Sequence, residues 1–331
     1  MKITIYDIAK KANVSTATVS KVINGTGKIS ETTKQKVLKI IEELDYRPNL
    51  MASALMTKKT STIGLLIPDI TNPYFSEVAR QIDNACKKND YFLTIYNTDN
   101  DEQQTKKAVD LLIQRGIDAL IISCRLEDSS LLEHLAKQKI PVLLFATTVT
   151  DFEVNTIVID EYQGVKTATQ HLITTGCKKI YFVGGAGTDR NSNKTRAYRD
   201  VMRDHGLSAH TFTINQSNSS LVRDKKELAA IFDTDVMADG IFACSDLAAV
   251  GILKAAHRRK IAVPQDLKIV GFDNIMFTEL TTPEITTVAQ PIQAMAEQGV
   301  DILINNIINP DAPKQNLIFT PELKIRESSV Y

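Results

Sequence analysis

Residues 15–24, STATVSKVIN, carry short polar side chains at a spacing that could contact a nucleic acid. Their Thr, Val and Ile content favours a strand, but a strand would put Lys21 on the same face as Val19 and Ile23. A helix instead groups Val19, Val22 and Ile23 at positions i, i+3 and i+4. We therefore predict a helix whose apolar side is turned inward.

The remaining surface of this predicted helix lacks the usual charged residues. Thr16, Ala17, Ser20 and Lys21 lie off the apolar side, and none of the ten residues is acidic. Short side chains let a helix enter a DNA major groove about 12 Å wide, where hydroxyl and methyl groups can contact phosphates or base edges. The alternative from these residues alone is an ordinary solvated helix of a small bundle.

The charge of the chain is divided unevenly along its length. Residues 1–60 contain 11 Lys and Arg against 5 Asp and Glu, a balance of +6, although the 331-residue chain as a whole is neutral. A basic head suggests contact with a polyanion such as a nucleic acid. The chain has no apolar run of about 18 residues and no secretory signal, so we expect a cytoplasmic protein with no membrane partner.

Helix signals cover the first 46 residues. Thr4 and Asp7 form a capping pattern before apolar residues at helical spacing, and Ser15 suits the start of the helix described above. Ser30 can cap a third helix. Residues 49–56, NLMASALM, are a further short helical candidate, and the polar residues after them suit a linker.

From residue 62 onward, short apolar runs alternate with helical patterns, which is typical of β-α-β units on parallel sheets. The fold class is therefore α/β, with ligands expected at the carboxyl ends of the strands and with room for two similar lobes. We expect strands at 62–68, 91–96, 118–123, 141–145, 155–160, 179–183, 240–244 and 268–272. We expect helices at 75–88, 101–115, 163–175, 221–232 and 246–260.

No arrangement of residues indicates a catalytic or metal site. The GGAG sequence at 184–187 lacks the spacing of a nucleotide-binding loop. No ligand spacing joins His171, His205, His210 and His257. Free thiols in a reducing cytosol are expected for Cys86, Cys124, Cys177 and Cys244. We expect neither a cofactor nor a metal, and a sugar-modifying α/β enzyme is the least favoured alternative.

The head, TIYDIAKKANVSTATVSKVING followed by KISETTKQKVLKIIEELDYRPN, resembles the lac-repressor/gal-repressor (LacI/GalR) family of bacterial transcription regulators. The likeness continues through IGLLIPDITNPYFSEV, CSDLAAVG, IVGFDN and TTVAQP, and so covers nearly the whole chain. It implies a helix-turn-helix head at 1–47, a hinge helix and linker at 48–60, and a core at 61–331 that is similar to periplasmic sugar-binding proteins. The implied core lobes are about 61–160 with 290–317, and about 161–289 with 318–331.

The resemblance also implies which head residues contact DNA. Thr16, Ala17 and Lys21 match positions that contact operator bases. Positions that hold the DNA backbone are matched by Thr4, Tyr6, Ser15, Thr18, Ser20, Asn24, Ser30 and Thr33. Many family members have Arg where this chain has Lys21, and because Lys cannot form the bidentate bonds of a guanidinium, we expect an altered operator preference.

Residues 49–56 match the hinge helix of the family, which orders on DNA, pairs with its twin in the minor groove and inserts a leucine between base pairs. Leu55 occupies the position of that leucine, and Asn49 and Ala52 lie on the same segment. A wedge in DNA explains an exposed leucine in a helix too short to be stable alone. The alternative is that Leu55 packs on the core.

Positions matching the effector contacts of the family lie along the core. They are Asn72, Phe75, Asp160, Ser245, Asp273 and Gln290. The ring of Phe75 can pack on the C–H face of a sugar, and Asp273 can accept hydroxyl bonds, although capping is the alternative role for Asp160 and Asp273. The family has an effector-binding Arg where this chain has Lys194, and Arg190 or Arg196 could substitute for it.

These features together predict a homodimer that binds double-stranded operator DNA. A small effector between the core lobes, a sugar or a sugar phosphate, is expected to control operator affinity, with the protein acting as a repressor of a carbohydrate-utilisation operon. The alternatives are the same regulator responding to a nucleobase or to a phosphorylated partner protein.

Overall fold

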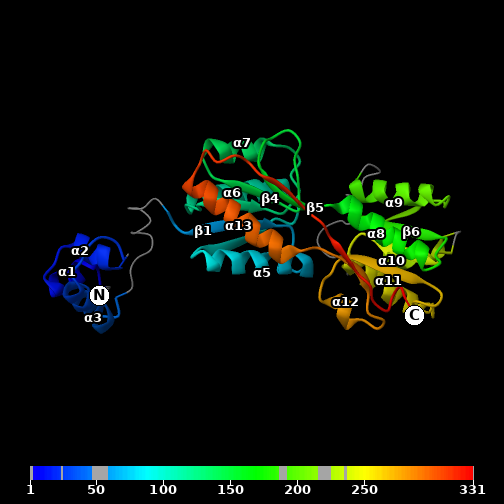
Figure 1. Cartoon of the computed structure of the whole chain (residues 1–331), viewed down its shortest axis with the longest axis horizontal. Helices are drawn as coiled ribbons and strands as arrows, with labels where there is room; N and C mark the ends of the chain where they lie inside the picture. The colour runs from blue at the N-terminus through cyan, green and yellow to red at the C-terminus, as the bar shows by residue number, and fades with distance from the viewer. Residues whose placement is uncertain are drawn as a thin grey trace. The chain divides into compact units, whose positions relative to one another are not determined.

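The computed structural model describes residues 3–23, 25–46, 59–185, 192–214, 225–234 and 237–330. It divides into two units, Met1–Thr60 and Ser61–Tyr331, each of which has its own core (Figure 1). Within the described ranges, no helix is long and apolar enough to cross a membrane.

The first unit is a three-helix head. Its helices are α1 (Ile5–Ala12), α2 (Thr16–Ile23) and α3 (Glu31–Glu43). Ile8, Val19 and Val37, one from each helix, are fully buried and pack together with their apolar neighbours. The predicted helix over the STATVSKVIN segment is therefore confirmed, and so are the helices on either side of it.

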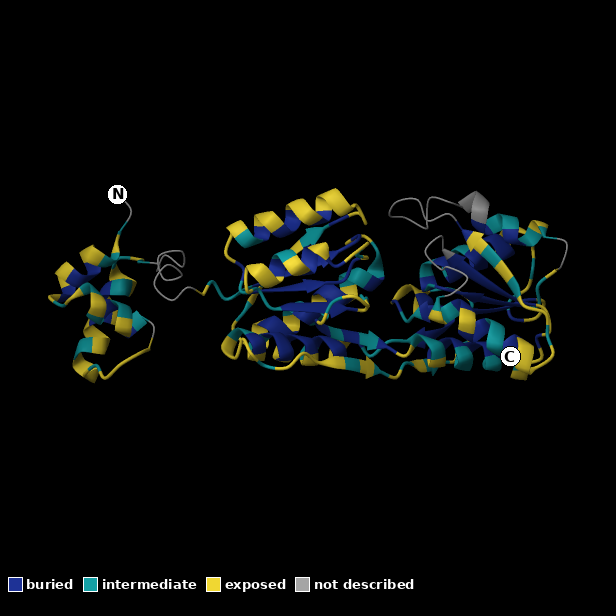
Figure 2. Ribbon diagram, turned by 90° about the horizontal axis from the view of Figure 1, so that it is seen from above, coloured by how far each residue is buried: buried dark blue, intermediate teal, exposed yellow. Residues whose placement is uncertain are grey.

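The first lobe of the second unit is a parallel six-stranded sheet in the order β11-β5-β4-β3-β1-β2. Its strands are β1 (Thr62–Ile67), β2 (Phe92–Asn97), β3 (Ala119–Ile122), β4 (Val142–Phe145), β5 (Asn155–Ile159) and β11 (Asn316–Phe319). The apolar clusters place α5 (Pro73–Lys88) and α13 (Ile292–Ile308) on one face, and α6 (Glu102–Gln114) and α7 (Ser130–Lys137) on the other. Strands β1, β3 and β4 are buried between helices that are exposed on their outer sides (Figure 2).

The second lobe has a six-stranded sheet in the order β12-β10-β9-β8-β6-β7. Its strands are β6 (Ile180–Gly185), β7 (His210–Ile214), β8 (Gly240–Ala243), β9 (Lys268–Asp273), β10 (Thr286–Ala289) and β12 (Glu322–Lys324). All the pairings are parallel except β10 with β12. Helices α8 (Glu161–Thr174) and α9 (Asn193–Asp204) cover one face, α10 (Lys225–Ala230, continued by a 3-10 turn, Ile231–Asp233) and α11 (Asp246–Arg258) cover the other, and α12 (Phe277–Leu280) follows β9.

The chain passes between the two lobes three times, after β5, after β10 and after β11. Each of these strands ends at the carboxyl edge of its sheet, so the crossings gather where such sheets bind ligands. Since β11 ends at Phe319, the third crossing lies just beyond the predicted residue 317. The predicted α/β class with two lobes is confirmed, although strands β7, β10, β11 and β12 were not predicted from sequence.

Truncating Ile8 to Ala should destabilise the head alone. Ile8 is fully buried in the head cluster, so its loss leaves a cavity that costs about 2–5 kcal/mol. Calorimetry of the full chain should show the head transition at lower temperature and the core transition unchanged. Leu38→Ala, on α3 and 39% exposed, is the matched control and should change little. An equal downward shift of the core transition would show that the two units do not unfold separately.

Candidate functional site

The outer side of α2 presents small side chains and one cation. Ala17 and Lys21 are exposed and lie one helical turn apart. Thr16 is half-buried at the boundary between this exposed surface and the core of the head. Val19 and Val22 are buried on the opposite side. The helix therefore turns its buried side to the head and leaves Ala17 and Lys21 available to a partner.

Serine caps set the start of two head helices. The Oγ atom of Ser15 accepts a hydrogen bond from the backbone N–H of Thr18 at 3.1 Å, and that of Ser30 accepts from the N–H of Thr33 at 3.4 Å. The paired hydroxyls Ser15–Thr18 and Ser30–Thr33 lie 2.9 and 2.8 Å apart. Two helix N-termini with flanking hydroxyls can thus reach an anion such as a DNA phosphate.

The start of α1 is held by Thr4 and Asp7. The carboxylate of Asp7 accepts bonds from the N–H and the hydroxyl of Thr4 at 2.8 and 2.7 Å, and these bonds lower the pKa of Asp7. Tyr6, in the first turn of α1, is 73% exposed. The Thr4 hydroxyl therefore already donates a hydrogen bond within the protein, to Asp7, whereas the Tyr6 side chain projects into solvent.

Some predicted contact residues cannot be placed. Asn24, Asn49, Ala52, Leu55 and Arg190 lie outside the described residues. Their roles, including the leucine wedge, stay predictions.

Gln290 links the two lobes at the second chain crossing. Its Nε2 donates to Oδ1 of Asp273, at the end of β9, at 2.9 Å. Its Oε1 accepts from the hydroxyl of Tyr74, on α5 of the first lobe, at 3.2 Å. Burial raises the pKa of the Tyr74 hydroxyl far above its usual range, so this group stays protonated and remains a donor. Asp273 and Gln290 are thus brought together as predicted, and Tyr74 was not anticipated.

Lys194, on α9 of the second lobe, brings a positive charge close to Asp273. Its Nζ lies 3.4 Å from Oε1 of Glu161, 3.5 Å from the carbonyl oxygen of Cys244 and 3.7 Å from the centre of the Phe272 ring. The side chain is only 16% exposed. Burial opposes the charged form, but Glu161 and Asp273 outweigh it and raise the pKa of Lys194.

Arg196, one of the possible substitutes, lies elsewhere on α9. It is exposed, donates to Oδ1 of Asn193 at 3.0 Å and lies 5.4 Å from the Tyr162 ring. Of the described basic residues that the sequence proposed for the effector, Lys194 is therefore the one placed beside Asp273 and Phe272.

Three further predicted effector residues act as helix caps. Asn72 Oδ1 accepts from the Tyr74 N–H at 3.1 Å, Asp160 Oδ1 from the Gln163 N–H at 2.9 Å, and Ser245 Oγ from the Ala248 N–H at 3.4 Å. The capping alternative is thus observed for Asp160, whereas Asp273 bonds Gln290 instead. These caps start α5, α8 and α11 at the carboxyl edges of the sheets.

Phe75 is half-buried at the start of α5. Its ring meets that of Tyr74 edge-on, with centroids 5.0 Å apart and planes at 71°. It packs against the main apolar cluster of the core, so its ring is held in place beside the residue that bonds Gln290.

Asp246, which the sequence did not indicate, holds the loop that carries Asp273. Its two carboxylate oxygens accept from the Thr287 hydroxyl at 2.6 Å and from the Ile275 N–H at 2.8 Å. Asp273 adopts a backbone φ of 118°, which residues with a side chain rarely do. A Cβ on Gly271 would lie 2.1 Å from Asp246 Oδ1, so only glycine leaves room for this carboxylate.

A buried carboxyl group, that of Asp246, and a half-buried one, that of Asp273, thus lie near each other. Burial raises the pKa of Asp246 to about 6, against the bonds from Thr287 and Ile275 that lower it. Burial and the negative charge of Asp246 together raise the pKa of Asp273 well above its usual range. The loop is thus fixed by a carboxyl group whose charge is disfavoured.

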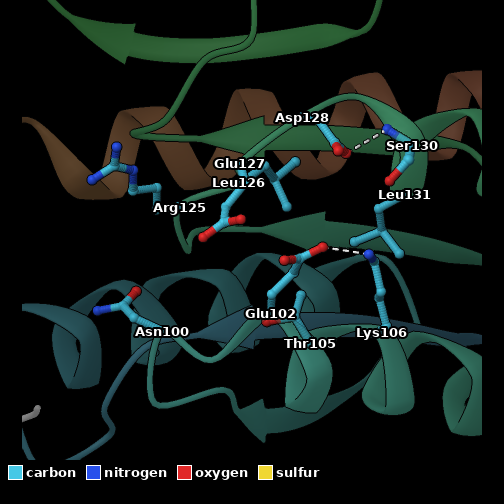
Figure 3. Close-up of a pocket in the computed structure, with 10 residues that line it drawn as sticks. All are labelled: Asn100, Glu102, Thr105, Lys106, Arg125, Leu126, Glu127, Asp128, Ser130 and Leu131. Atoms are coloured by element: carbon cyan, nitrogen blue, oxygen red, sulfur yellow. Dashed lines mark hydrogen bonds and ion pairs between the residues drawn. The ribbon is translucent and has the colours of Figure 1, made fainter.

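A separate pocket of about 500 Å³ opens on the first lobe and contains none of the predicted effector residues (Figure 3). It lies between the start of α6 and the segment before α7. Lys106 in its wall is ion-paired with Glu102, and Asp128 accepts from the Ser130 N–H at 2.9 Å. Four of its lining residues thus bond in pairs. Over the part of the chain that is described, no three His, Cys, Asp or Glu side chains form a group that could hold a metal ion.

Two family models match the chain. The one described as bacterial regulatory proteins, lacI family, matches residues 4–49, and the one described as a periplasmic binding protein-like domain matches residues 169–329. The HTH-type transcriptional regulator DegA of Bacillus subtilis (strain 168) is 36% identical over 99% of this chain and 98% of its own. This relative and the lacI family model indicate a transcriptional regulator rather than an enzyme.

Solved structures share the fold. A periplasmic binding protein/LacI transcriptional regulator from Alkaliphilus metalliredigens QYMF, complexed with D-xylulofuranose, is 29% identical with a TM-score of 0.73 over 82% of this chain and 100% of that one. The lac repressor dimer bound to operator and the anti-inducer ONPF is 21% identical with a TM-score of 0.88 over 100% of both chains. Because the lac repressor is only 21% identical to this chain, the comparison with it shows a shared fold and nothing more.

Replacing Asp246 by Asn should change how stability depends on pH. The folded pKa of about 6 lies above the ordinary 3.8, so the folded state binds the proton more tightly, and this favourable contribution is lost as the pH rises from about 4 through 6. The wild type should therefore lose up to about 3 kcal/mol of stability relative to Asp246→Asn over that range. Urea unfolding at each pH measures the difference.

The control for this comparison is Asp301→Asn, since Asp301 is exposed on α13. Its difference from the wild type should stay constant between pH 4 and 7. A constant difference for Asp246→Asn as well would contradict the raised pKa.

Proposed function

Because the chain belongs to the LacI family of bacterial regulatory proteins, which are DNA-binding transcriptional regulators, we propose that it represses a carbohydrate-utilisation operon. Each head of a homodimer takes one half of a pseudo-palindromic operator. A sugar-like effector at the crossing between the core lobes changes operator affinity.

The exposed side of α2 is the main support for DNA binding by the head. Ala17 and Lys21 point outward from a helix whose Val19 side is buried in the head. A helix of this kind can enter the major groove, while the Ser15 and Ser30 caps and Tyr6 contact the backbone. The balance of +6 over residues 1–60 supplies attraction to phosphates.

The effector part rests on the side chains at the lobe crossing. Asp273, Gln290 and Tyr74 offer acceptors and donors to hydroxyl groups, and Phe75 offers an aromatic ring. The relative from Alkaliphilus metalliredigens was solved with D-xylulofuranose, a sugar, which supports a ligand of this class for the present chain. Because the bonds of Gln290 join the lobes, a ligand that replaces them would shift the lobes relative to each other.

Two apolar surfaces on the core suit the homodimer. Met276, Phe277 and Leu280, at and beside α12, are 65%, 41% and 68% exposed. On the first lobe, the edge strand β2 exposes Phe92 (64%) and Ile95 (43%). Grouped apolar side chains and an open sheet edge usually mark an interface, and the similar lac repressor was solved as a dimer on its operator.

Lys21→Ala should relax operator preference at the base pairs that Lys21 contacts. Loss of a base contact costs about 1–3 kcal/mol against the preferred sequence and less against others. Fluorescence anisotropy on a selected operator and its single-base-pair variants measures this. Lys36→Ala, an exposed Lys of α3, is the control and should weaken all sequences equally. Equal weakening of all sequences by Lys21→Ala would remove its base-reading role.

Leu280→Glu should dissociate the homodimer, because it buries a charge in an apolar interface. Sedimentation velocity should show monomers at concentrations where the wild type is dimeric, and operator affinity should fall with the loss of the second head. The control is Ile318→Glu, since Ile318 is 71% exposed on β11, at the opposite edge of the first sheet from β2. A Leu280→Glu protein that remains dimeric would place the interface elsewhere.

A further inference from the structure

The turn that follows α2 bears on how Lys21 meets DNA, an inference that rests on the proposed function. Lys21 is exposed in the last turn of α2, and its four-carbon stem can adopt many rotamers. An ammonium group also lacks the planar fork that gives a guanidinium its direction. The surface on which the stem lies therefore directs the charge.

Gly27 supplies such a surface. A Cβ added to this glycine would lie 3.2 Å from Cδ, 3.6 Å from Cε and 3.8 Å from Cγ of Lys21. These are the three nearest atoms outside the glycine and its chain neighbours, so the stem of Lys21, rather than its ammonium, faces Gly27. Gly27 has a φ of 79°, in the left-handed region that glycine adopts without strain. Its lack of a side chain leaves room for Lys21.

The turn that carries Gly27 is fixed on both sides of the glycine. On the α2 side, the backbone N–H of Thr26 donates to the carbonyl oxygen of Lys21 itself at 2.9 Å, the long bond of a Schellman helix end. On the α3 side, Ile29 packs against the apolar cluster of the head. Ser30 follows directly and caps α3. Gly27 is therefore held in one place relative to the backbone of Lys21.

We propose that Gly27 is a positioning residue for Lys21: because it lacks a Cβ, it seats the methylene stem and directs the ammonium toward one set of base edges. A stem that is already seated loses less rotamer freedom on binding DNA than a free one. A Cβ at position 27 would approach Cδ more closely than ordinary van der Waals contact. Since Lys21 is exposed, its stem would then move away, and Gly27 thus acts on operator preference through Lys21.

Gly25→Ala is the matched control for Gly27→Ala. Both glycines have a positive φ, 64° and 79°, so alanine strains the backbone at either position, but a Cβ on Gly25 would meet nothing within 4 Å. Fluorescence anisotropy of the full chain on a selected operator and its single-base-pair variants measures preference. Gly27→Ala should lower the preference at the base pairs that Lys21→Ala affects, by at least about threefold. Gly25→Ala should weaken all sequences equally.

A second variant separates the contact with Lys21 from backbone strain. Gly27→Asn keeps the Cβ with less strain, since Asn is enriched at positive φ, and should lower the preference in the same way. In a Lys21→Ala background, neither change at Gly27 should alter the preference further, because there is no stem to displace.

Two results would overturn the proposal. One is a Gly27→Ala or Gly27→Asn protein that weakens all sequences equally, as Gly25→Ala does. The other is a loss of preference that persists undiminished in the Lys21→Ala background, because Gly27 would then not act through Lys21. Failure of the proposed base contact is a separate result, since it would show as an unchanged preference in Lys21→Ala alone, and it would remove the positioning role as well.

Discussion

The two hydrogen bonds of Gln290 are the constraint on which the rest of the core depends. They tie Asp273 of the second lobe to Tyr74 of the first at one of three chain crossings. Because Asp273 also interacts with Lys194 and Asp246, one amide connects the lobe contact to the charges of the site. A ligand that bonds Asp273 or Tyr74 must therefore compete with, or add to, the contact that sets the lobe arrangement. In the proposed function, effector binding and lobe position would therefore be coupled through shared atoms.

The segment between β9 and α12 connects Asp273 to the proposed dimer surface at Leu280. After Asp273, whose φ is 118°, the chain continues through Asn274 to α12. Arg326 donates to Oδ1 of Asn274 at 2.8 Å and to Oε1 of Glu279 at 2.6 Å, so it fixes both ends of this segment. Backbone strain of this kind persists only where surrounding bonds over-determine it. Asp273 and Leu280 therefore lie at the two ends of one segment that Arg326 holds at Asn274 and Glu279.

Local sequence signals predicted the head and most of the parallel strands. Ser15, Ser30 and the spacing of Val19 with Val22 identify helices because capping and periodicity depend on near neighbours in the chain. β11 and β12 could not be identified in this way, since both are short strands with few buried side chains. Their pairing depends on β5 and β10, which lie far away in sequence.

The site was predicted in part for the same reason. The family resemblance indicated Asp273, Gln290 and Lys194, which the structure brings close together. Tyr74 and Asp246 were not predicted as site residues, because a Tyr within a helix and an Asp at the start of a helix are common for purely local reasons. Their partners, Gln290 and Thr287, are distant in sequence, so only the folded chain shows what they bond.

In the proposed function, ligand binding at the lobe crossing and DNA binding at the head are linked. Its most direct test measures the dissociation constant for an operator, selected from random duplexes by the full chain, with and without a saturating sugar. We expect a change of about 5–150-fold, together with an equal change in sugar affinity when operator is saturating. An operator affinity that is the same with and without bound sugar would contradict it.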